Sequence, residues 1–130
     1  MYSQQVISHF ENPRNVGDIS NADASVRVEN PACGDIMQLS LRLAPETGAG
    51  PAAIIDDARF RIRGCVTSIA CGSVLTEMLR GKSVAQAKTI KRQQVVDALG
   101  GLTNETMHGS YLVMDALSAA LAQLNASRTS

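Results

Sequence analysis

The sequence lacks the features that mark several large classes of protein. Its 12 lysines and arginines are balanced by 12 aspartates and glutamates, so no net charge attracts nucleic acid or an anionic membrane surface. No apolar run approaches the ~20 residues that span a bilayer, and the first residues have neither the basic start nor the apolar segment of a secretory signal. Three cysteines are too few, and odd in number, for a disulfide framework. We therefore expect a cytoplasmic protein that binds neither nucleic acid nor membrane.

Aromatic residues are also scarce, at 3% of the chain with no tryptophan, whereas 45% of the 130 residues are hydrophobic. A chain of this length is expected to bury about two-thirds of its unfolded surface, which is enough for one core. No internal repeat or low-complexity linker divides the chain. The sequence thus predicts a single domain over residues 1–130 with a mainly aliphatic core.

Hydrophobic periodicity predicts strands in the first half of the chain and helices in the second. Alternation of apolar and polar residues predicts three strands, over 24–29, 37–43 and 55–63, with a bulge at 55–57 where the alternation breaks. Helical spacing predicts helices over 3–11, 66–79, a short stretch opening at 83–86, 91–99 and 106–125. The helix over 66–79 is expected to have one apolar face. We therefore predict an α+β fold, with a three-stranded antiparallel sheet and helices packed on one face.

The few residues that could bind a metal lie at junctions between these elements. Cys33 and Asp35 stand in the turn between the first two strands. Cys65 precedes the long helix, and His108 lies in the first turn of the last one. Functional groups concentrate at such junctions, and two thiols, an imidazole and a carboxylate suit a tetrahedral zinc or iron site. Against this, each cysteine taken alone is more often a core residue, and the chain has no Cys-x-x-Cys pair.

Other candidates are expected to have structural roles. Cys71 follows Cys65 by six residues on the same predicted helix, so about 600° of rotation and about 9 Å of rise separate them. Metal–thiolate bonds are about 2.3 Å long, so we expect Cys71 in the core and not among the ligands. His9, beside Phe10 on the first helix, is expected at the surface. The third strand should present its arginines on a solvated face, with a docking surface as the alternative: Arg59, Arg61 and Arg63.

Four segments in this order resemble the NifU/IscU-type iron–sulfur cluster assembly scaffolds: HFENPRNVG at 9–17, PACGD at 31–35, DARF at 57–60 and GC at 64–65. The resemblance extends from Tyr2 to about Leu124. It implies a scaffold, not an enzyme, which assembles a [2Fe–2S] cluster or binds iron and passes it to acceptor apo-proteins. The sulfur would come from a cysteine desulfurase. The matching ligand positions are Cys33, Asp35, Cys65 and His108.

The sequence departs from the family at two places. The family's third cysteine directly follows the histidine, and this sequence has Gly109 there. Alignment implies that position 109 faces the ligands, whereas helix propensity alone allows a harmless glycine at a helix entry. The chaperone-recognition segment Leu-Pro-Pro-Val-Lys corresponds to residues 102–106, where only Leu102 is retained, so support for an Hsp70-type partner is small.

An alternative follows from the missing thiol. The chain could be a zinc-binding thiol protein that accepts persulfide sulfur from a cysteine desulfurase and relays it. Zinc is also the metal we expect in the isolated protein. The sequence leaves open whether the chain forms a homo-oligomer.

Overall fold

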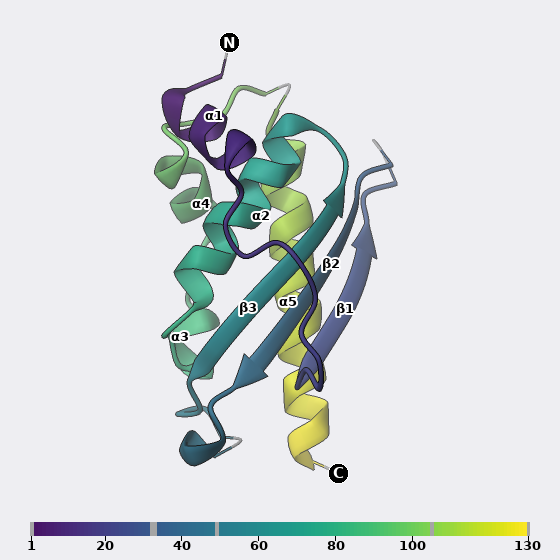
Figure 1. The fold of residues 1–130 in the computed structure, drawn as a ribbon, viewed down its shortest axis with the longest axis vertical. Helices are drawn as coiled ribbons and strands as arrows, with labels where there is room; N and C mark the ends of the chain where they lie inside the picture. Colours follow the sequence, from purple (N-terminus) through teal and green to yellow (C-terminus); the bar gives the residue numbers. More distant parts are fainter. Residues whose placement is uncertain (1, 32–33, 49, 105, 130) are drawn as a thin grey trace.

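A computed structural model describes residues 2–31, 34–48, 50–104 and 106–129 of the chain (Figure 1). In chain order the elements are α1 (Gln4–Glu11), β1 (Ala24–Glu29), β2 (Ile36–Leu43), the 3-10 helix η1 (Pro45–Thr47), β3 (Ile55–Arg63), α2 (Val66–Leu79), α3 (Val84–Ala87), α4 (Arg92–Ala98) and α5 (His108–Thr129). No helix among the described residues combines the length and the apolar character needed to cross a membrane.

The three strands form one antiparallel sheet in the order β1-β2-β3. Arg42 of β2 pairs with Asp57, but the next residue, Leu43, pairs with Ile55. Asp56 is therefore the extra residue of a β-bulge, which confirms the irregularity predicted from the broken alternation. The α+β prediction and the antiparallel connectivity are also confirmed.

Helices α2 and α5 lie along one face of the sheet, and α1 and α4 pack against α2 from outside (Figure 1). The apolar side chains of the strands point toward these helices and are almost fully buried; they include Met37, Leu39, Leu41 and Phe60. The aliphatic core predicted from the composition is thus located between the sheet and the helices.

Helix α2 differs from the prediction of a single apolar face. Its serines and threonines are buried as well: Thr67, Ser68, Ser73 and Thr76. The reason is its central position, because the sheet and α5 cover one side of α2 while α1 and α4 cover the other. Buried hydroxyls need partners, and several of these residues find them in segments far away in the sequence.

His9 is one such partner, and the expectation that it lies at the surface was wrong. Its side chain is only 13% exposed, and its Nδ1 lies 2.7 Å from the Ser73 Oγ of α2. Helix α1 docks on α2 through this polar contact, which local sequence pattern does not reveal.

The segment between α1 and β1 crosses the other face of the sheet (Figure 1). It pairs with the outer edge of β3, since Gly17 N–H donates to Phe60 O at 2.9 Å and Phe60 N–H donates to Asn15 O at 2.9 Å. Asp18 in this segment forms an ion pair with Arg61 at 3.0 Å. The arginine-bearing side of β3 is thus partly crossed by the chain itself, although Arg61 remains exposed.

Candidate metal centre

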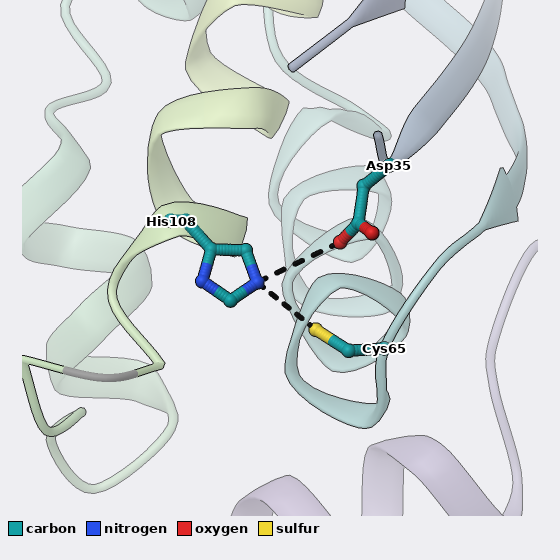
Figure 2. A group of neighbouring side chains, drawn as sticks. All are labelled: Asp35, Cys65 and His108. Atoms are coloured by element: carbon teal, nitrogen blue, oxygen red, sulfur yellow. Dashed lines mark hydrogen bonds and ion pairs between the residues drawn. The ribbon is translucent and has the colours of Figure 1, made fainter. Parts of the chain in front are cut away.

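Three of the four residues expected in the site converge from three elements. Asp35 precedes β2, Cys65 caps the N-terminus of α2, and His108 is the first residue of α5. One ligand atom of each lies within 4.8 Å of the other two (Figure 2). His108 Nε2 is 3.2 Å from Cys65 Sγ and 3.6 Å from Asp35 Oδ2. Cys33, the fourth, lies outside the described residues.

A closed turn positions Asp35. Asn30 N–H donates to Asp35 O at 2.8 Å, and Gly34 N–H donates to Asn30 O at 2.7 Å. Gly34 has a φ of 76°, a left-handed conformation that costs glycine little and other residues more. The turn therefore places Asp35 at the head of β2, next to the junction between β3 and α2.

Gly64 makes the close approach of that junction to Asp35 feasible. A Cβ atom at position 64 would lie 2.6 Å from Asp35 Cγ and 2.8 Å from its Oδ2. The carboxylate thus packs directly on the backbone that precedes Cys65. Any side chain at position 64 would displace it.

Asp35 is only 7% exposed, and burial by itself raises the pKa of a carboxyl group. Hydrogen bonds from Ser68 and from the backbone and side chain of Cys65, together with the charge of His108, outweigh burial and lower the pKa of Asp35. The carboxylate is therefore ionised at neutral pH, so it is an oxygen donor ready for a cation.

Two of the separations between the ligand atoms are close to those expected around a tetrahedral ion. Metal bonds of about 2.3 Å to sulfur and about 2.1 Å to nitrogen or oxygen place tetrahedral ligands about 3.4–3.6 Å apart. The separations of 3.2 Å and 3.6 Å measured from His108 Nε2 are close to these values. The three donors found among the described residues leave one tetrahedral position for a further ligand.

Cys71 is fully buried, as expected from its place on the helix. Burial, with a smaller contribution from Cys65, raises the pKa of Cys71 to about 12. Its thiol is therefore protonated at neutral pH, whereas the thiolate is the form that binds metals.

Sequence reasoning missed Ser68, whose Oγ donates to Asp35 Oδ2 at 2.6 Å and lies 3.3 Å from Cys65 Sγ. One available indication was its spacing, since residues three apart on a helix share a face. Ser68 follows Cys65 by three positions.

Position 109 faces Ser68. A Cβ atom at Gly109 would lie 2.9 Å from Ser68 Cα and 3.2 Å from its Oγ. Position 109 is therefore directed at the helix turn that carries Cys65, and the absence of a side chain there allows α5 to approach α2 closely.

Comparison with known proteins agrees with this fold. The NifU-like N terminal domain matches residues 1–130. The iron-sulfur cluster assembly scaffold protein IscU of Escherichia coli K12 is 42% identical over 130 residues, covering 98% of this chain and 96% of that protein. IscU 1 of Archaeoglobus fulgidus is 43% identical over 121 residues, covering 93% of this chain and 74% of that protein.

A solved structure shows the same architecture. The crystal structure of a nitrogen-fixing NifU-like protein (N-terminal) from Brucella abortus matches with a TM-score of 0.72 at 13% identity. The match covers 95% of this chain and 93% of that one. Fold and sequence therefore agree that this chain is a NifU-like N-terminal domain. The chain belongs to the NifU/IscU family, which confirms the resemblance stated from the sequence motifs.

Proposed function

We propose that this protein is an iron–sulfur cluster assembly scaffold or carrier, which binds iron or a [2Fe–2S] cluster and transfers it to acceptor apo-proteins. The observation that carries the proposal is the convergence of a thiol, an imidazole and an ionised carboxylate within 4.8 Å. The names of its E. coli and A. fulgidus relatives support the same function. We also propose one domain over residues 1–130 and a cytoplasmic location.

In this proposal the ligands are Cys33, Asp35, Cys65 and His108. Thiolates suit iron–sulfur clusters, and a ligand set that includes histidine has a precedent in Rieske centres. Asp35 supplies a hard oxygen, which matches an iron–sulfur cargo less well than sulfur does. It is therefore the ligand that we expect to exchange first when the cargo leaves.

The partners follow from the same chemistry. A cysteine desulfurase would supply sulfur, and apo-proteins with thiolate sites would receive the cluster. The protein itself would act as a binding platform and not as an enzyme.

The second candidate function is that of a zinc-binding thiol protein that relays persulfide sulfur. Two observations favour this alternative: the thiol, imidazole and carboxylate donors also suit zinc, and a glycine stands in place of the third family cysteine. It would hold zinc and no cluster.

Anaerobic reconstitution with ferric iron and sulfide, followed by visible absorption and metal analysis, tests the proposal. These reactants form a [2Fe–2S] cluster without net electron transfer. We expect cluster bands in the wild-type protein and in the matched control Cys71→Ser, and their loss in Cys65→Ser. Zinc bound at Cys65 without any cluster would favour the persulfide relay. Neither metal nor cluster bound at Cys65 would overturn both functions.

A further inference from the structure

Ser68 is a buried hydroxyl that touches two of the three donor groups. The residue is 0% exposed. Its Oγ is 2.6 Å from Asp35 Oδ2 and 3.3 Å from Cys65 Sγ. A buried polar group costs stability unless it is paired, and both of these partners of Ser68 belong to the candidate metal centre.

The direction of the hydrogen bond follows from the chemistry of the pair. An ionised carboxylate can only accept, so the single proton of the Ser68 hydroxyl is donated to Asp35. Hydrogen bonds to a charged group are short and strong, and the distance of 2.6 Å agrees with this. The bond therefore fixes the same Asp35 oxygen that lies 3.6 Å from His108 Nε2.

Ser68 also lies in direct contact with the helix that carries His108. A Cβ atom at Gly109 would come within 2.9 Å of Ser68 Cα and 3.0 Å of Ser68 N. The first turn of α5 therefore packs directly on Ser68, and His108 is the residue before the contacting Gly109. One residue of α2 thus contacts both the carboxylate at the head of β2 and the start of α5.

We propose that Ser68 is a positioning residue of the metal centre, which orients Asp35 through its hydroxyl. The absence of a side chain at Gly109 lets the start of α5 pack on Ser68, so that His108 lies near the same Asp35 oxygen. The inference rests on the proposed metal binding by Asp35, Cys65 and His108. Hydrogen-bond partners of metal ligands typically contribute 10–100-fold to metal affinity. Ser68 therefore belongs to the site although it is not itself a ligand.

The variant Ser68→Ala removes the hydroxyl and adds no bulk. Its matched control is Ser73→Ala, on the same helix and also 0% exposed, whose Oγ contacts His9 instead. Zinc affinity of the full chain is measured by competition with a chromophoric chelator. We expect Ser68→Ala to bind zinc about tenfold more weakly or worse, and Ser73→Ala to bind it as the wild type does.

A double-mutant cycle shows whether Ser68 acts through Asp35. When two residues act through one interaction, the free-energy effects of mutating them do not add. Ser68→Ala should therefore weaken zinc binding far less in an Asp35→Asn background than in the wild type. The cobalt(II) absorption spectrum gives a second readout, because the sulfur-to-cobalt band should persist in Ser68→Ala while the ligand-field bands change.

Gly109→Ala keeps the inference testable if Ser68→Ala does not fold. Its methyl group would press on Ser68, so zinc binding should weaken as well. Zinc affinity of Ser68→Ala within twofold of wild type, or an equal loss with and without Asp35, would overturn the inference alone. A wild-type protein that binds no zinc, iron or cluster would overturn the proposed function together with it.

Discussion

Two polar clusters lie along helix α2 and are built from similar residues. The metal-site cluster consists of Asp35, Cys65, Ser68 and His108. The α1 cluster consists of His9, Arg14, Ser73 and Glu77. Each combines a histidine, a buried serine hydroxyl and a carboxylate, and they differ in the fourth member, a thiol in one and a guanidinium in the other.

The fourth member decides what each cluster can bind. In the α1 cluster, Ser73 Oγ accepts from Arg14 N–H at 2.9 Å and contacts His9 Nδ1 at 2.7 Å. Arg14 and Glu77 also approach each other at 3.9 Å. A permanent cation repels metal ions, so this arrangement serves to dock α1. The metal-site cluster contains no arginine or lysine among its members and offers a soft sulfur ligand instead.

The largest expected difference is in metal affinity. His108→Ala removes a ligand and should weaken zinc binding by more than ~100-fold, which exceeds the usual effect of an outer partner. His9→Ala should leave zinc affinity unchanged, since its ring lies in the α1 cluster. Chelator competition on the two variants measures the difference. Equal losses in both would remove the distinction between the clusters.

The second prediction concerns the backbone that supports Asp35. Gly64→Ala should destabilise the protein by about 1–3 kcal/mol, as overpacking does, because the new methyl would overlap the Asp35 carboxylate. Zinc affinity should fall as well. Gly50→Ala is the control, since a Cβ there meets nothing within 4 Å. Thermal unfolding and zinc titration should find Gly50→Ala close to wild type. A Gly64→Ala variant with the stability and zinc affinity of Gly50→Ala would contradict the described packing.

The third and smallest effect is the pH dependence of the α1 cluster. Burial first, and then the charge of Arg14, lower the pKa of His9 below its ordinary 6.5, against the opposing effect of Glu77. The unfolded chain therefore binds more protons between the lowered pKa and 6.5. The corresponding stability is complete above pH 6.5 and is lost as the pH falls through the lowered pKa.

Urea unfolding at pH 7.5 and pH 5.5 tests this prediction. The wild type should lose more stability between these two values than His9→Gln, whose side chain does not titrate. Ordinary stability changes common to both proteins cancel in the comparison. An equal loss in both would show that His9 has the same pKa in the folded and unfolded chain.

The contrast between the clusters also explains how much the sequence could predict. The bulge at Asp56 and the junction positions of Asp35, Cys65 and His108 follow from local periodicity, and the structure agrees with them. The roles of His9 and Ser68 depend on contacts with residues 64 and 33 positions away. Local pattern does not encode such contacts, so a histidine beside a phenylalanine gave the wrong expectation of exposure.

Burial of α2 on both sides was unpredictable for the same reason. Its serines and threonines suggest a solvated face, but three of these four hydroxyls are hydrogen-bonded inside the protein: Ser68 and Ser73 to distant segments, and Thr76 to the helix backbone. The composition of α2 shows only that hydroxyls are present. Their partners come from α1, from the turn before β2 and from the helix backbone itself.

We predict that metal binds at the cluster of Asp35, Cys65 and His108 and not at the α1 cluster. The chain has only two histidines, so nitrogen-15 spectra of the imidazole rings, with His9→Gln for assignment, resolve both during a zinc titration. We predict that the His108 Nε2 resonance shifts until one equivalent of zinc is bound, while the His9 ring does not change. A shift of His9 alone, or of neither ring, would contradict the account.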